Sequence, residues 1–275
     1  MYADDTNIFF TGTTKTCLEK SVNDYLLKLS RWLQANRITL NTTKSKYVIF
    51  KPTSVRDQNP ISIRYEGSLL EEVTEQKFLG VWFSSDLSWN AHVSCLKSDL
   101  SRIIGCLYRI QHLIPSWMKQ TLYYSLFYSR ISYGILVWGT TTETNYKKLI
   151  TLQKKVLRIC ENYHGENREL RTHPLFLKYN MLRADKVYYF KLLQWIHKNR
   201  LYVTSTDRIN LYAIRDPKIE MPRIRTNYGR QALSFQVIRI LNRRDININY
   251  SKPFSTFKNE CKGALLCSDV TYSNR

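Results

Sequence analysis

The chain has 275 residues, of which 43% are hydrophobic and 13% aromatic, and its 42 lysines and arginines outnumber 22 acidic side chains for a formal net charge of +20. This apolar content excludes an intrinsically disordered chain, and only 9 glycines and 7 prolines exclude a collagen-like one. No stretch approaches the roughly eighteen apolar residues of a membrane span, and no secretory signal pattern opens the chain. We therefore expect a soluble intracellular protein, neither secreted nor bound to a membrane.

The positive charge is concentrated in the last two thirds of the chain. Residues 1–90 carry 11 basic and 10 acidic side chains, whereas residues 91–275 carry 31 basic and 12 acidic ones. Clustered lysines and arginines gain affinity for phosphates by releasing counterions, so a polyanionic partner is indicated; the alternative is a merely solvated basic surface. The six cysteines and five histidines are dispersed, which predicts neither a zinc site nor a Cys/His nucleophile.

The first ninety residues predict a mixture of α and β structure. The predicted elements are a strand at 7–10, a helix from Thr16 to near Asn36, a turn at 41–44, a strand at 47–50, a strand at 61–65 that turns back at Glu66-Gly67, and a strand at 78–83. Thr16 and Glu19 form a capping-box pattern ahead of apolar side chains spaced three and four residues apart.

From Asn90 onward the apolar period becomes helical. The predicted helices start at Asn90, at Pro115 (running to Ile131), near Leu149 (running to Ile159), at Met181 (running to His197) and at Ala232 (running to Leu241). The first three are amphipathic with a basic outer face. Together these patterns predict the α+β class with a predominantly helical second part.

The pattern most specific for chemistry is Tyr2-Ala3-Asp4-Asp5 at the start of the chain. Two adjacent carboxylates at a turn suit Mg²⁺, with Mn²⁺ as an alternative, because hard cations prefer carboxylate and phosphate oxygens. Paired ions of this kind activate a 3′-hydroxyl and stabilise a leaving pyrophosphate. The competing interpretation is an ordinary Asp-rich turn that bonds its own backbone.

Three motifs in order resemble the reverse transcriptases of non-LTR (LINE-like, jockey-type) retrotransposons. Tyr2-Ala3-Asp4-Asp5 resembles the catalytic Y-x-D-D signature, Asn41-Thr42-Thr43-Lys44-Ser45 the next palm motif, and Phe78-Leu79-Gly80-Val81 the primer-grip element. The resemblance implies a partial palm at 1–90, with an incomplete antiparallel sheet and one helix, a helical thumb-like region at 91–165, and a basic, mostly helical C-terminal region at 166–275.

The resemblance also implies roles for individual residues. Asp4 and Asp5 would hold the metal, and Lys44 would stabilise the departing pyrophosphate, although a solvated turn lysine explains Lys44 equally well. Gly80 would admit the primer backbone, and a β-bulge is the competing explanation for it. The residues expected beside primer or substrate are Tyr2, Ala3, Phe78, Leu79 and Gly80.

Two further segments resemble the region after the palm in the same family. Leu87-Ser88-Trp89 with His92 looks like the start of its helical part, and Tyr133–Gly139 looks like a Y-G-x-x-x-W-G element. Helix packing is the favoured explanation of both segments, and direct substrate contact is the alternative.

The family's fingers and its upstream palm aspartate have no matching residues in this sequence. We therefore expect a fragment of an RNA-directed DNA polymerase that is inactive alone. Its partners would be an RNA template with a DNA primer, or an RNA–DNA duplex, and deoxynucleoside triphosphates if it is active. The resemblance also implies a location in the nucleus or in a cytoplasmic ribonucleoprotein. One alternative is a non-catalytic nucleic-acid binder, and another is an unstable relic. The basic residues expected to bind nucleic acid are Lys147, Lys148, Lys154, Lys155 and Arg158, with Arg223, Arg225, Arg230, Arg239, Arg243 and Arg244 further on.

Overall fold

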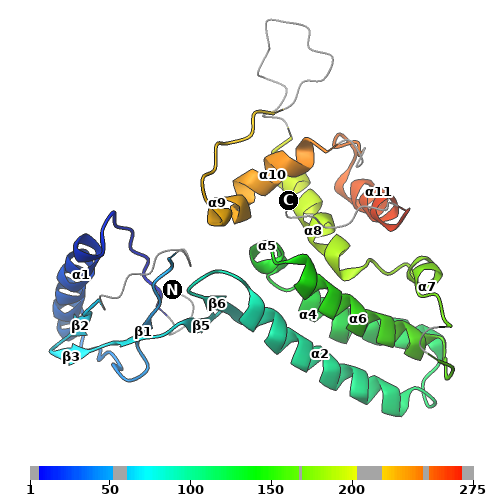
Figure 1. Cartoon of the computed structure of the whole chain (residues 1–275), viewed down its shortest axis with the longest axis horizontal. Coiled ribbons are helices and arrows are strands. Elements are labelled where there is room, and N and C mark those ends of the chain that lie inside the picture. Colours follow the sequence, from blue (N-terminus) through cyan, green and yellow to red (C-terminus); the bar gives the residue numbers. More distant parts are fainter. Residues whose placement is uncertain (1–5, 52–60, 167–168, 203–218, 244–247, 268–275) are drawn as a thin grey trace, which may run out of the picture. The chain divides into compact units, whose positions relative to one another are not determined.

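The computed structural model describes residues 6–51, 61–166, 169–202, 219–243 and 248–267 (Figure 1). The chain divides into two compact units, Met1–Leu87 and Ser88–Arg275. Because residues 88–90 carry no charge, the nearly neutral part of the sequence coincides with the first unit and the +19 excess with the second. The predicted regions 91–165 and 166–275 both lie in the second unit.

The first unit combines one long helix with short strand pairs. Its elements are α1 (Lys15–Ala35), β1 (Lys46–Tyr47), β2 (Arg64–Tyr65), β3 (Ser68–Leu69), β4 (Glu71–Glu72), β5 (Glu75–Phe78) and β6 (Val81–Ser84). Within the described residues the strands form three two-stranded sheets, parallel for β1–β4 and antiparallel for β2–β3 and β5–β6. These elements, with the helical second unit, confirm the α+β class. The predicted single antiparallel sheet is wrong for the described residues, because the strands pair only two by two and β1 pairs with β4 in parallel.

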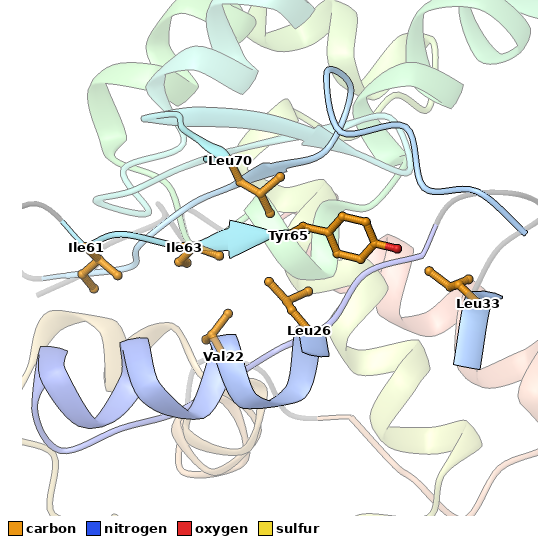
Figure 2. Close-up of a cluster of buried hydrophobic side chains, with 7 residues drawn as sticks. All are labelled: Val22, Leu26, Leu33, Ile61, Ile63, Tyr65 and Leu70. Atoms are coloured by element: carbon orange, nitrogen blue, oxygen red, sulfur yellow. The ribbon is translucent and has the colours of Figure 1, made fainter. Parts of the chain in front are cut away.

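The core of the first unit lies between α1 and the β2–β3 hairpin. Figure 2 shows the side chains of α1 facing those around β2. The buried apolar residues are Val22, Leu26, Leu33, Ile61, Ile63, Tyr65 and Leu70. The amide of Asn23 joins the two layers, since its Nδ2 donates to the Ser62 carbonyl (3.0 Å) and its Oδ1 accepts from the Arg64 N–H (2.9 Å). The amide thus satisfies backbone groups next to β2, where unpaired polar groups would be costly.

Turn chemistry in the first unit agrees with the sequence at two places. The predicted turn-back at Glu66-Gly67 is confirmed, because both residues have positive φ (47° and 81°) and Tyr65 pairs with Ser68 as in a two-residue hairpin. The predicted end of the first helix at Asn36 is also confirmed. Its start is not at Thr16, since Thr14 is the N-cap and accepts from the Cys17 N–H at 3.2 Å.

All four strand predictions in the first unit are wrong or too long, and the one at 61–65 reduces to β2 at Arg64–Tyr65. Residues 7–10 form no strand, because no described strand pairs with them; Phe9 is 76% exposed and Phe10 packs against the core. The predicted strand at 47–50 reduces to β1 at Lys46–Tyr47. The predicted strand at 78–83 is a hairpin, with β5 ending at Phe78 and β6 beginning at Val81.

The second unit is helical throughout its described residues. Its elements are α2 (Asn90–Ile110), α3 (Ser116–Leu122), the π-helix η1 (Tyr123–Tyr128), α4 (Ser129–Ser132), α5 (Ile135–Trp138), α6 (Glu143–Cys160), α7 (His173–Lys178), α8 (Ala184–Lys198), α9 (Asn227–Gln231), α10 (Leu233–Leu241) and α11 (Phe254–Cys267). Helix α2 lies along α6, and α8 contacts α4, α5, α6, α10 and α11 (Figure 1). Helix α8 therefore lies at the centre of this unit.

The helices predicted after Asn90 are confirmed as α2, α6, α8 and α10, although α6 begins at Glu143, well before the predicted start near Leu149. Pro115 is the N-cap of α3 and not its first residue. The predicted helix to Ile131 is confirmed, since α3, η1 and α4 follow one another without a gap, with η1 as a π-helical segment. Helix α11 was not predicted, although its buried residues Phe257, Cys261 and Leu265 are four apart. In the described part of the chain, no helix has the length and apolar character required to cross a membrane.

Candidate nucleic-acid interface

The acidic motif of the sequence lies outside the described residues. This applies to Tyr2, Ala3, Asp4 and Asp5 together. Among the residues that the structure does describe, no group of three or more histidine, cysteine and acidic side chains could hold a metal ion. The metal role of Asp4 and Asp5 therefore stays a prediction.

The predicted lysine turn is confirmed as a turn, and Asn41 organises it. The Asn41 Oδ1 accepts from the Lys44 N–H (3.1 Å) and from the Thr43 hydroxyl (2.6 Å), while the Asn41 carbonyl accepts from the Ser45 hydroxyl at 2.8 Å. Such side-chain bonds to nearby backbone are typical of Asx turns. They hold the backbone of Lys44 while its side chain is exposed, an arrangement compatible with both a catalytic and a solvated lysine.

The Phe78–Val81 element is the tip of the β5–β6 hairpin. Leu79 and Gly80 both have positive φ, at 46° and 81°, as the two central residues of a type I′ turn require. Neither the predicted single strand nor the competing bulge describes Gly80, whose conformation is that of a turn residue. The Leu79 side chain is 42% exposed at the tip, and the rings of Phe78 and Phe83 lie 6.4 Å apart beneath it.

Helix α6 carries a basic stripe opposite its buried stripe. Lys147, Lys154 and Lys155 are exposed, and Lys148 and Arg158 are partly buried. The buried apolar side chains on the other side are Tyr146, Leu149, Leu152, Val156, Leu157 and Ile159. We call the five basic residues of α6 the α6 basic face.

Two lysines of the α6 basic face already have partners. Lys147 forms an ion pair with Glu143 (2.9 Å) in which both side chains are largely exposed, so the pair contributes little to stability. The Nζ of Lys148 donates to the Oδ1 of Asn145 at 3.0 Å. Within the described residues, no ion pair involves Lys154 or Lys155, which makes these two lysines the most accessible cations of the face.

The arginines further along the chain divide into exposed and tethered groups. Arg223, Arg225 and Arg230 are exposed, Arg239 is half-buried, and Arg244 lies outside the described residues. Arg243 donates to the Tyr189 hydroxyl at 3.0 Å, and its guanidinium lies 5.1 Å from the centroid of that ring. Arg243 therefore packs within the helical unit and is less suited than the α6 lysines to an external partner.

The Tyr133–Gly139 segment is a packing corner, which confirms the structural explanation of this motif. Trp138 is fully buried, and its Nε1 donates to the Tyr133 carbonyl at 2.8 Å. The Tyr146 hydroxyl donates to the Gly139 carbonyl at 2.6 Å and thereby ties the corner to α6. A side chain at Gly139 would collide with the Ile135 carbonyl oxygen and the Tyr188 ring, so glycine is required here for space.

Trp89 and His92 are also buried in the helical unit. Trp89 is 4% exposed and its Nε1 donates to the Gln231 Oε1 at 2.7 Å, which joins the start of α2 to α9. The His92 ring lies 5.2 Å from the Trp138 ring, and burial lowers the His92 pKa from 6.5 to about 4. His92 is therefore neutral in the folded protein at physiological pH.

A buried lysine that the sequence analysis did not single out, Lys119 of α3, binds a backbone carbonyl at the C-terminal end of α6. Lys119 is 2% exposed, its Nζ donates to the Ile159 carbonyl at 3.3 Å, and it also contacts the Asn162 Oδ1. A cation at the C-terminal carbonyls of a helix complements the helix dipole. The nearby Cys160 thiol is buried, which raises its pKa to about 11 and keeps it protonated. No local pattern predicts this contact, because Lys119 and Ile159 are distant in the sequence.

Comparisons with known proteins agree with the motif resemblance. The chain is 22% identical over 209 residues to "Probable RNA-directed DNA polymerase from transposon X-element" of Drosophila melanogaster, which covers 73% of this chain and 22% of that protein. It is 28% identical over 160 residues to "RNA-directed DNA polymerase from mobile element jockey" of Drosophila funebris (57% of this chain, 17% of that protein). It is 25% identical over 154 residues to "Retrovirus-related Pol polyprotein from type-1 retrotransposable element R1" of Bradysia coprophila (54% and 15%).

The chain spans about a fifth of the length of the curated relatives that it matches. No protein-family model matches the chain. No solved structure matches it either.

Proposed function

Because the chain is related to the RNA-directed DNA polymerases of non-LTR retrotransposons, we propose that its second unit binds the template and primer strands of such a polymerase. The observation that carries this proposal is the α6 basic face, with exposed lysines opposite a buried apolar stripe in the unit that holds nearly all the excess positive charge. Lysines on a rigid helix neutralise phosphates and release counterions.

The expected recognition is of the sugar–phosphate backbone and not of base sequence. Lysine is a flexible point charge without the planar fork that reads a guanine edge, and contacts to phosphates position a protein without specifying sequence. Such binding suits a polymerase, which must translocate along any template.

Charge removal on α6 tests the binding proposal. In the variant Lys147→Gln/Lys154→Gln/Lys155→Gln, we expect weaker binding of a labelled single-stranded RNA and a salt dependence shallower by about 2 in log–log slope, because each lost phosphate contact removes roughly 0.7. Fluorescence anisotropy over a series of salt concentrations measures both quantities.

The matched control removes three exposed charges from helix α1 of the first unit. The variant Lys20→Gln/Lys28→Gln/Arg31→Gln has the same net charge as the α6 variant, and its three sites are exposed. We expect it to bind RNA as the unaltered chain does. RNA binding by the unaltered chain that does not depend on salt would contradict the proposal.

The catalytic part of the proposal assigns Mg²⁺ to Asp4 and Asp5 and the pyrophosphate to Lys44. It rests on the three motifs in order and on the relatives, with the Asn41 turn holding the backbone of Lys44. When bound, the metal supplies activation of the primer 3′-hydroxyl and charge neutralisation at the leaving group. The exposed Lys44 ammonium would add positive charge beside the pyrophosphate.

Primer extension on an RNA template with Mg²⁺ tests the catalytic part. Template-dependent synthesis that disappears in Asp4→Ala, but persists in a variant at the exposed helix residue Asp24 (Asp24→Ala), would support the assignment. Synthesis that survives Asp4→Ala would contradict it. Salt-dependent RNA binding without any synthesis would favour the non-catalytic nucleic-acid binder.

A further inference from the structure

Helices α8 and α11 bring four lysines from distant parts of the chain to two cavities of the second unit. The first cavity, of about 190 Å³, is lined by Lys258 and Lys262 of α11 together with Tyr124 and Tyr128 of η1. The second, of about 300 Å³, is lined by Lys191 and Lys198 of α8 together with Trp195 and Gln194. We call Lys191, Lys198, Lys258 and Lys262 the α8–α11 lysine cluster.

The lysines of the cluster repel one another. Burial lowers the pKa of Lys191, and the charges of Lys258 and Lys198 lower it further. Burial likewise lowers the pKa of Lys262, with a further contribution from Lys258. The two helices also pack directly against each other, and Lys198 of α8 lies over the Phe254 ring of α11, so the lysines of both helices belong to one positively charged region.

No carboxylate neutralises this cluster among the residues that the structure describes. Glu260, the acidic residue of α11, forms its ion pair with Lys252 at 2.8 Å instead. Aromatic rings stabilise two of the ammonium groups. The Lys198 Nζ lies 4.8 Å from the Phe254 ring centroid, and the Lys262 Nζ lies 5.4 Å from the Tyr124 ring centroid. Cation–π contacts of this kind stabilise an ammonium group without cancelling its charge.

The position of Lys262 is held by hydrogen bonds. The Tyr124 hydroxyl donates to the Asn180 carbonyl at 2.6 Å and accepts from the Lys262 Nζ at 3.4 Å. Because the tyrosine proton is already engaged with a carbonyl, the hydroxyl presents a lone pair to the ammonium. Lys262 is thus oriented at the edge of the first cavity before any ligand arrives, which lowers the entropic cost of binding an anion.

We propose that the α8–α11 lysine cluster binds consecutive phosphates of a single RNA or DNA strand, as a second phosphate-binding site besides the α6 basic face. The assignment rests on the proposed function, because it takes the nucleic acid as the polyanion. Four cations spread over two cavities match several linked phosphates better than one isolated anion. The tyrosine and tryptophan rings that line the cavities would provide surfaces on which the bases of the bound strand stack.

The test is charge removal within the cluster. For the variant Lys191→Gln/Lys258→Gln/Lys262→Gln, we expect an affinity for labelled single-stranded RNA about tenfold lower at physiological salt, and a salt slope shallower by about 2. The charge-retaining variant Lys191→Arg/Lys258→Arg/Lys262→Arg should keep the affinity, which separates loss of charge from loss of folding. The matched control Lys20→Gln/Lys28→Gln/Lys97→Gln removes three exposed lysines elsewhere and should bind like the unaltered chain.

The outcomes distinguish this inference from the proposed function. If the cluster variant binds RNA like the unaltered chain while the α6 variant is weakened, the cluster is not a binding site and the proposed function stands. If neither variant changes binding, both are overturned. Displacement of the RNA by an equimolar deoxynucleoside triphosphate would assign the cluster to a free nucleotide and overturn its assignment to a strand.

Discussion

Replacing Trp138 by alanine is expected to lower the free energy of unfolding by about 3 to 5 kcal/mol, the usual cost of removing a large buried aromatic side chain. Trp138 is fully buried at the corner between α5 and α6, where it contacts the rings of His92 and Tyr146 and its indole N–H is bonded to the Tyr133 carbonyl. Alanine would leave a cavity and would remove the indole donor to the Tyr133 carbonyl. Urea unfolding followed by circular dichroism measures the change.

The matched control for this prediction is Trp117→Ala in the same unit. Trp117 lies on α3 with 66% of its surface exposed, so its removal should change the unfolding free energy by less than about 0.5 kcal/mol. Equal losses in the two variants would show that burial of Trp138 does not decide the effect. Since small domains are stable by roughly 5 to 15 kcal/mol, the Trp138 variant should be largely unfolded under mild denaturant.

Acidification is expected to destabilise the helical unit through His92. The folded-state pKa of His92 is about 4, below the unfolded value of 6.5, so the unfolded chain binds a proton that the folded chain excludes. Stability is therefore lost as the pH falls from about 6.5 towards 4. Between pH 7 and pH 5 the expected loss from this one residue is about 2 kcal/mol, since each pKa unit corresponds to about 1.4 kcal/mol.

Unfolding free energies at pH 7 and pH 5 for the unaltered chain and for His92→Gln isolate this contribution. Glutamine does not titrate, so the variant should lose about 2 kcal/mol less on acidification, whatever its stability at pH 7. The control His173→Gln replaces an exposed histidine and should keep the pH dependence of the unaltered chain. An unchanged pH dependence in His92→Gln would refute the burial argument.

Local sequence patterns correctly predicted features that depend on neighbouring residues. The turn at Glu66-Gly67, the Asn41 turn and helices α1, α2, α6, α8 and α10 all follow from turn chemistry and apolar spacing within a few residues. The exposed lysines of α6 were predictable for the same reason, because their spacing places them opposite the buried stripe. The resemblance to retrotransposon polymerases likewise came from motif order, and the comparisons find similarity to proteins of that kind.

Features that depend on packing were missed or misjudged. The apolar run at 78–83 looked like one strand, and only the pairing of β5 with β6 shows that Leu79 and Gly80 form a turn. The run at 7–10 has strand-forming residues, yet a strand requires a paired neighbour, and none of the described strands lies beside it.

The +20 charge illustrates the same division. A count of charged residues along the sequence was enough to assign the excess positive charge to the helical unit, since such a count does not depend on the fold. The packing of the helices determines where individual lysines lie. It buries Lys119 against the end of α6 and brings Lys191, Lys258 and Lys262 to two cavities. These lysines and their neighbours are far apart in the sequence, so the spacing of residues along the chain cannot predict their contacts. Only the tertiary structure shows which lysines lie together in candidate binding sites.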